Sequence, residues 1–147
     1  MKRKTALITG ATSGIGEACA RRFANGGYNL IITGRTADRL KTLKAEFEAL
    51  GVDVLALAFD VCDREATRQA VASIPESFKP IDVLINNAGL ARGLEPEYEG
   101  SFQDWDEMID TNIKGLLNMT RLVVPEMVSL NHGHVINIGS VAGDAAY

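Results

Sequence analysis

The sequence Thr-Gly-Ala-Thr-Ser-Gly-Ile-Gly, residues 9–16, lies between a short apolar run and a segment with apolar residues at helical spacing. This order predicts a strand, a glycine-rich turn and a helix. Gly10 allows a sharp backbone turn, Gly14 a close approach to a pyrophosphate, and Gly16 tight packing of the helix on the strand. Unpaired N–H groups at the start of a helix attract anions. The stretch therefore predicts a phosphate-binding turn, although such glycines also suit a plain strand–helix turn.

Short apolar runs and amphipathic segments alternate along the rest of the chain. The expected strands are 6–8, 29–33, 54–59, 83–85 and 135–138, and the expected helices are 36–50, 63–74 and a long one that starts at Ser101. Asp63 and Ser101 are expected helix caps, and Pro125 is expected to bend or interrupt the long helix. This alternation predicts an α/β fold, with a doubly wound parallel sheet of the Rossmann type covered on both faces.

The composition is that of an ordinary globular domain. The chain has 147 residues, of which 46% are hydrophobic and 23% charged, and its net charge is −4. No basic surface is expected that would bind nucleic acid or an anionic membrane. No apolar run suggests a signal peptide or a membrane span, so we expect a cytoplasmic protein. Cys19, Cys62, His132 and His134 lack the clustering of a disulfide framework or a metal site, so no metal is expected.

Polar residues follow the expected strands, and in a doubly wound sheet ligands bind beyond the carboxyl ends of the strands. Arg35 follows the second strand, where an arginine pairs with the 2'-phosphate of NADP and an acidic residue would favour NAD. A solvent-facing arginine is the simpler alternative. Thr36 and, more weakly, Arg39 lie within reach of the same region. Asp60 and Val61, after the third strand, could bracket an adenine.

Two further segments carry candidate functional groups. The run Asn86-Asn87-Ala88-Gly89 combines amides that can hold a loop together with small residues that leave room for a flat ligand, although it also suits a simple turn. Asn112 falls on the apolar stripe of the long helix, so we expect a buried amide that needs partners and stabilises an irregular turn. Ser140 follows the fifth strand, where a serine is usually a turn or cap residue.

These motifs occur in the order and at the intervals of the short-chain dehydrogenase/reductase family, which the sequence resembles over essentially its whole length. The resemblance implies an NADP(H)-dependent oxidoreductase that interconverts an alcohol and a carbonyl compound. It implies that Ser140 bonds the substrate carbonyl, and that a backbone perturbation at Asn112 holds a water that links the catalytic lysine to solvent. It also implies a homo-oligomer.

The resemblance also implies a set of cofactor-binding residues. Gly10, Ala11, Thr12, Ser13, Gly14, Ile15 and Gly16 would form the pyrophosphate turn, Arg35 and Thr36 the 2'-phosphate site, Asp60 and Val61 the adenine site, and Asn87, Ala88 and Gly89 the side of the nicotinamide ribose. Segments 86–96, 105–121 and 131–143 look similar to NADP-dependent 3-hydroxy acid dehydrogenases that act on serine, allo-threonine or related small acids.

The resemblance breaks down at the end of the sequence. In the family, a tyrosine and a following lysine exchange the proton, and they lie farther beyond the serine than Tyr147, which is therefore not assigned as catalytic. We expect residues 1–147 to be the NADP-binding part of a longer enzyme and to be inactive alone. The alternatives are a catalytically inactive dinucleotide-binding module and a methyltransferase-like domain. Arg35 argues against the methyltransferase-like domain, because such a domain is expected to have a ribose-binding acidic residue at that position.

Overall fold

The computed structural model describes residues 1–145 and has a five-stranded parallel sheet at its centre, in the order β3-β2-β1-β4-β5. The strands are β1 (Thr5–Ile8), β2 (Asn29–Gly34), β3 (Val54–Ala58), β4 (Val83–Asn86) and β5 (His134–Asn137). The chain runs from β1 outward to β3, then crosses back to β4 beside β1 and on to β5. This topology confirms the predicted doubly wound sheet. Its strand order reverses between β1 and β4, and ligands bind at such a reversal.

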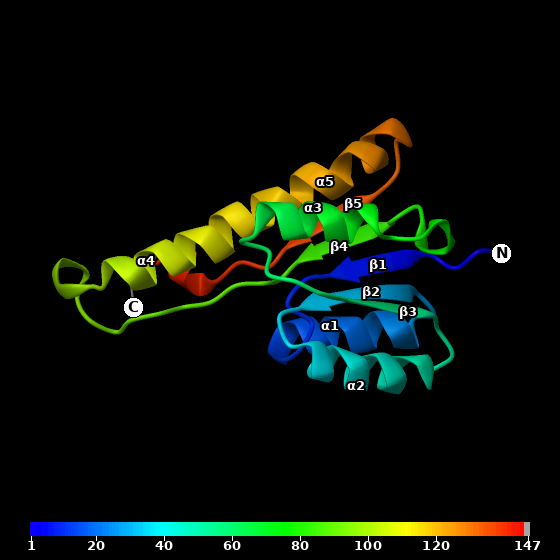
Figure 1. Ribbon diagram of the computed structural model, residues 1–147, viewed down its shortest axis with the longest axis horizontal. Coiled ribbons are helices and arrows are strands. Elements are labelled where there is room, and N and C mark those ends of the chain that lie inside the picture. Colours follow the sequence, from blue (N-terminus) through cyan, green and yellow to red (C-terminus); the bar gives the residue numbers. More distant parts are fainter. Residues whose placement is uncertain (146–147) are drawn as a thin grey trace.

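Helices cover both faces of the sheet (Figure 1). The helices α1 (Gly14–Asn25) and α2 (Ala37–Glu48) lie on one face, and α3 (Arg64–Ala72) and α5 (Leu116–Ser129) lie on the other. Successive residues of β1 contribute to the two cores in turn, because side chains alternate across a strand: Ile8 packs with α1 and α2, and Leu7 packs with α5. Both side chains are fully buried, as expected for a central parallel strand.

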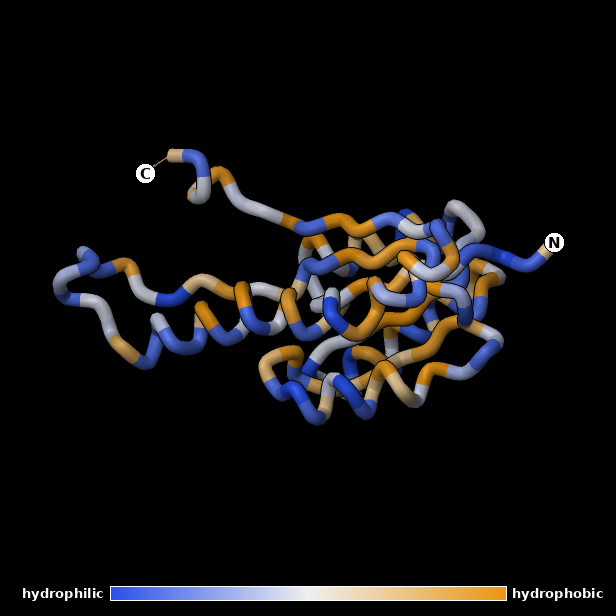
Figure 2. Tube along the Cα trace, turned by 90° about the horizontal axis from the view of Figure 1, so that it is seen from above, coloured by the Kyte–Doolittle hydropathy of each residue, from blue (hydrophilic) through white to orange (hydrophobic). Residues whose placement is uncertain are grey.

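The long helix projects beyond the sheet. It consists of α4 (Phe102–Ile109), a π-helical turn (Asp110–Gly115) and α5, and α4 extends far past the strands, as Figures 1 and 2 both show. It begins where predicted, with Ser101 Oγ accepting a hydrogen bond from the N–H of Asp104 at 3.4 Å. We call residues 90–117 the arm.

The structure corrects two expectations about this helix. Pro125 does not interrupt it, because Val123 and Met127 on either side of the proline are buried against the sheet and this packing holds α5 together. The irregularity lies at the π-helical turn instead. The apolar stripe expected to face inward is partly exposed, at 45% for Ile109, 54% for Ile113 and 57% for Leu117, because the arm lies past the end of the sheet.

The predicted cap of α3 is confirmed. Asp63 caps α3 by accepting a hydrogen bond from the N–H of Ala66 at 2.9 Å. β5 forms one edge of the sheet that the structure describes. None of the helices within residues 1–145 combines the length and the apolar character that crossing a bilayer requires.

Candidate cofactor-binding site

The carboxyl ends of β1, β2, β3 and β4 surround a cleft of about 360 Å³. Four of the five strand ends therefore converge on one cleft, and none of the described residues that follow β5 lines it. The lining residues are Gly10, Thr12, Ser13, Gly14, Ile15, Thr33, Gly34, Arg35, Phe59, Asp60, Val61, Asn87, Ala88, Gly89, Leu90 and Thr111.

The glycine turn has the conformation that its sequence predicts. Gly10 and Gly14 have φ angles of +61° and +56°, which residues with a side chain rarely adopt. A Cβ at Gly16 would lie 2.1 Å from the carbonyl oxygen of Gly10, so only glycine allows α1 to approach β1 this closely. A Cβ at Gly14 would meet no atom within 4 Å, so space is open above the turn.

Ala11 differs from its neighbours in the turn. Its side chain is fully buried, and its N–H donates to the carbonyl oxygen of Thr33 at 2.9 Å. Ala11 does not line the cleft, and its part in cradling a pyrophosphate stays a prediction. The residue attaches the turn to β2, because a small side chain is needed where the turn passes over the core.

Hydrogen bonds join the turn to the end of β4. The Asn87 amide nitrogen donates to the carbonyl oxygens of Thr9 and Gly10 at 3.1 and 3.0 Å. In return, the buried Thr9 hydroxyl accepts from the N–H groups of Asn87 and Ala88, each at 3.0 Å. Asn87 thus holds the loop together as predicted, and its Oδ1 is the atom left for a ligand hydroxyl. Sequence reasoning missed Thr9, whose signal was a β-branched polar residue directly after an apolar strand.

Arg35 provides the positive charge at the β2 side of the cleft. Its side chain is exposed, and it forms no ion pair or side-chain hydrogen bond within residues 1–145. A Cβ at the preceding Gly34 would lie 2.6 Å from the Thr12 methyl group, so the turn packs directly against the end of β2. Thr36 is exposed at the start of α2 but does not line the cleft.

Asp60 and Val61 form the β3 side of the cleft. One oxygen of Asp60 accepts from the N–H of Cys62 at 2.9 Å, so the other is available to a ligand. Val61 packs against Gly115, where a Cβ would lie 2.6 Å from a Val61 methyl group. The amide of Asn118, a buried residue that sequence reasoning missed, donates to the Val61 carbonyl oxygen at 2.9 Å. The long helix therefore fixes the position of this wall.

Cys62 lies just behind the same wall. Its Sγ is 3.1 Å from the Thr111 hydroxyl, and partial burial raises the pKa of its thiol, as do the nearby acidic groups. The thiol is therefore neutral at physiological pH. Cys62 is a free, half-buried cysteine.

The two residues expected to be catalytic lie outside the cleft lining. Asn112, on the π-helical turn, is exposed rather than buried, and its amide exchanges two hydrogen bonds with the backbone of Leu90, at 2.9 and 2.8 Å. The expected irregular turn and partnered amide are thus confirmed, but the expected burial is wrong. Ser140 is exposed, and its Oγ accepts from the N–H of Ala142 at 3.1 Å, as a cap. Tyr147 lies outside the described residues.

The histidines are distant from the cleft. His132 Nε2 lies 2.8 Å from an oxygen of Asp82, next to the start of β4. The other Asp82 oxygen accepts from the N–H of Thr5 at 2.8 Å, so this carboxylate joins β1 to the turn before β5. Within residues 1–145, no cluster of three or more histidine, cysteine or acidic side chains could hold a metal ion.

The strand order and the glycine turn at the reversal point define a doubly wound α/β domain of the Rossmann type. A profile of the short chain dehydrogenase family matches residues 4–147. The chain therefore belongs to the short-chain dehydrogenase family, as its motifs predict.

The chain is also similar in sequence and in structure to named dehydrogenases. The sequence is 54% identical over 141 residues to an NADP-dependent 3-hydroxy acid dehydrogenase of Salmonella typhi, covering 96% of this chain and 56% of that protein. It is 48% identical to the serine 3-dehydrogenase of Agrobacterium fabrum, covering 97% and 56%. A structure of serine dehydrogenase in complex with NADP+ superposes with a TM-score of 0.92 at 50% identity, covering 97% of this chain and 56% of that one. The chain thus spans little more than half the length of these relatives.

Proposed function

We propose that the protein is an NADP(H)-dependent oxidoreductase that interconverts a small hydroxy acid, or hydroxy amino acid, and its carbonyl form. The observation that carries the proposal is Arg35, a cation without a partner among the described residues, at the edge of a cleft that a glycine turn lines on one side. The relatives that share about half of the sequence are named as NADP-dependent 3-hydroxy acid dehydrogenases and as serine dehydrogenases. Residues 1–147 would be the NADP-binding part of this enzyme.

The cleft fits a dinucleotide phosphate by its shape and its donors. The open space above Gly14 and the uncapped start of α1 suit a pyrophosphate, and Arg35 with Thr36 suits the 2'-phosphate. The free Asp60 oxygen and Val61 suit the adenine. Asn87 Oδ1 suits the ribose on the nicotinamide side, where Ala88 and Gly89 leave room for a flat ring. A bound nicotinamide would supply the hydride.

Ser140 and Asn112 are proposed for the substrate end of the site. Both lie in segments that project past the carboxyl edge of the sheet, the arm and the residues after β5 (Figures 1 and 2). Ser140 would donate its hydroxyl hydrogen to the substrate oxygen, since among the described residues its Oγ accepts from Ala142 and donates to no acceptor. Asn112 would hold the π-helical turn against the loop at Leu90. No tyrosine or lysine of residues 1–145 lines the cleft, so we propose that the proton-transferring pair lies elsewhere in the protein.

Two further proposals are the oligomeric state of the enzyme and its location in the cell. We propose a homo-oligomer, because the arm carries an exposed apolar stripe that includes Ile109, Ile113 and Leu117. We place the protein in the cytoplasm, which suits its unpaired Cys19 and Cys62.

A fluorescence titration of the full-length protein with NADPH and NADH, and a calorimetric titration with S-adenosylmethionine, test the proposal. We expect NADPH to bind most tightly. Arg35→Ala should weaken NADPH binding by about 1.5–3 kcal/mol, the size of a charge-assisted contact, and leave NADH nearly unchanged. Arg68→Ala is the matched control, because that arginine is exposed on α3 and its one partner among the described residues is Glu65.

Each alternative has its own outcome. Tight binding of S-adenosylmethionine would indicate the methyltransferase class. NADPH binding by a full-length protein that turns over no 3-hydroxy acid would indicate an inactive dinucleotide-binding module. NADH binding tighter than NADPH would contradict the role of Arg35.

A further inference from the structure

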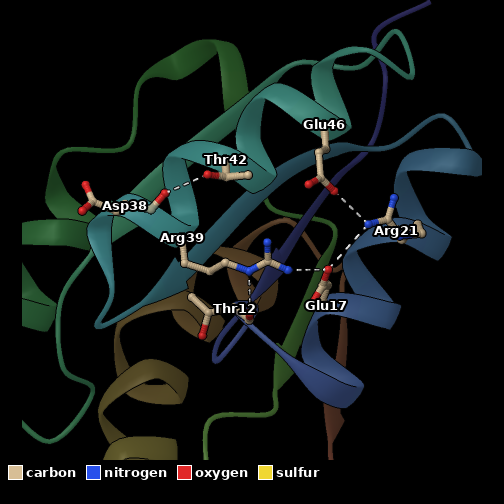
Figure 3. Close-up of polar contacts among 7 residues, drawn as sticks. All are labelled: Thr12, Glu17, Arg21, Asp38, Arg39, Thr42 and Glu46. Atoms are coloured by element: carbon tan, nitrogen blue, oxygen red, sulfur yellow. Dashed lines mark hydrogen bonds and ion pairs between the residues drawn. The ribbon is translucent and has the colours of Figure 1, made fainter.

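Arg39, on α2, reaches back to the glycine turn (Figure 3). Its Nε donates to the carbonyl oxygen of Thr12 at 3.2 Å, and its Nη2 pairs with an oxygen of Glu17 at 2.9 Å. Glu17 stands in the first turn of α1, directly after the glycine turn. Two nitrogens of the guanidinium group, Nε and Nη2, are therefore engaged by the protein itself.

This ion pair is part of a larger network between α1 and α2. The same Glu17 oxygen lies 3.6 Å from Arg21 Nη2, which pairs with Glu46 at 3.0 Å. The Arg21 guanidinium also lies over the Phe47 ring, 5.2 Å from its centre. Glu17 is thus held from two sides, and it in turn holds Arg39 in the direction of the turn. A network of several charges keeps its geometry better than an isolated surface pair does.

The bond to Thr12 determines how the turn presents its backbone. In a trans peptide, the C=O of one residue and the N–H of the next point in opposite directions. Because Arg39 binds the Thr12 carbonyl on the α2 side, the Ser13 N–H points away from Arg39. Ser13 lines the cleft, and its N–H makes no backbone hydrogen bond within residues 1–145. It is therefore a free donor at the start of α1, where an anion would bind.

Arg35 contrasts with Arg39 in this respect. Arg35 lines the cleft without a partner among the described residues, whereas Arg39 does not line it and is bound by Thr12 and Glu17. The sequence places both arginines within reach of the expected 2'-phosphate site, but in the structure they make different contacts.

We propose that Arg39, oriented by Glu17, is a positioning residue that fixes the Thr12–Ser13 peptide so that the Ser13 N–H faces the pyrophosphate. The selectivity for the 2'-phosphate then rests on Arg35. This inference depends on the proposed dinucleotide-binding function. The sequence places Arg39 more weakly within reach of the 2'-phosphate region, whereas in the structure it is engaged at the glycine turn.

The test compares three ligands on the full-length protein and its Arg39→Met, Arg35→Ala and Glu17→Gln variants. NADPH has both the pyrophosphate and the 2'-phosphate, NADH has only the pyrophosphate, and adenosine 2'-monophosphate has only the 2'-phosphate. We expect Arg39→Met to weaken NADPH and NADH by the same factor, about tenfold, and to leave adenosine 2'-monophosphate unchanged. Arg35→Ala should weaken NADPH and adenosine 2'-monophosphate but spare NADH. Fluorescence titration measures the binding of the two dinucleotides, and NMR line broadening measures the binding of adenosine 2'-monophosphate.

Glu17→Gln tests the orienting role. It should weaken both dinucleotides equally but less than Arg39→Met does, and the double variant should be no weaker than Arg39→Met alone, because the two residues act through one contact. Arg39→Lys keeps the charge but has a single nitrogen in place of Nε and Nη2, and it should bind both dinucleotides with intermediate affinity. It also provides a folded variant if Arg39→Met is unstable.

Two results would overturn the inference. A selective loss of NADPH over NADH in Arg39→Met would make Arg39 a 2'-phosphate ligand. An equal loss of all three ligands would show general damage to the fold rather than positioning of the turn. If the unaltered protein bound neither dinucleotide, the proposed function would fail first, and this inference with it.

Discussion

At the scale of the residue, Gly16 shows how one missing side chain sets the geometry of the site. A Cβ there would lie 2.1 Å from the Gly10 carbonyl oxygen and 2.4 Å from the Asn87 amide nitrogen. The same amide nitrogen holds the turn to the end of β4. A side chain at this position would therefore separate α1 from β1 and strain the contact between two strand ends.

We predict that Gly16→Ala lowers the free energy of unfolding by about 1–3 kcal/mol, the cost of overpacking, and weakens dinucleotide binding. Gly139→Ala is the matched control, because a Cβ at Gly139 meets no atom within 4 Å. It should stay within about 0.5 kcal/mol of the unaltered protein. Urea unfolding followed by circular dichroism measures both values. Equal stability of the two variants would mean that the close approach of α1 to β1 is not required.

At the scale of the element, helix ends followed their sequence signals more closely than helix interiors did. Asp63 and Ser101 both cap helices as predicted, because a cap is a local contact between residues three apart. Pro125 did not interrupt α5, because packing on either side outweighed the local effect of the proline. The π-helical turn at 110–115 was expected only as an irregularity at Asn112.

We predict that Asp63→Ala lowers the free energy of unfolding by about 0.5–2 kcal/mol, through loss of the bond to the Ala66 N–H. Asp63→Asn keeps an acceptor at the same place and should be close to the unaltered protein. Chemical denaturation of the three proteins provides the comparison. A loss in Asp63→Asn as large as that in Asp63→Ala would point to the charge of Asp63 rather than to its capping bond.

At the scale of the whole molecule, the arm is the feature that needs a partner. Its apolar stripe is exposed, since it lies past the end of the sheet on which α5 packs. Exposed apolar surface of this extent usually marks an interface. A second copy of the chain is the occupant that we propose.

We predict that the full-length protein sediments as a homo-oligomer and that Ile113→Glu shifts it toward a monomer, because a charge in the centre of the stripe would be desolvated on association. Leu50→Glu is the matched control: Leu50 is also an exposed apolar residue, but it lies at the end of α2. Sedimentation velocity separates these states. A monomeric unaltered protein would remove the proposed interface and indicate that other segments of the same protein cover the stripe.

Much of the architecture and part of the site could be predicted because they depend on local patterns. Strand and helix periodicity determined the order of the elements. The rule that parallel strands align their carboxyl ends brought Gly14, Arg35, Asp60 and Asn87 to one cleft. These inferences do not require knowing which side chains are in contact. The rules for connecting parallel strands allow only a few topologies, and each of them aligns the carboxyl ends of the strands.

Only the tertiary structure decided which atoms of the site are already engaged. Thr9 binds the backbone after β4, Asn118 binds Val61, and Arg39 binds Thr12, each across elements far apart in the chain. The same applies to exposure: Asn112 lies on a predicted apolar face, yet that face extends past the sheet. Periodicity shows which face of a helix is apolar, but whether another layer covers that face depends on where the helix lies relative to the sheet.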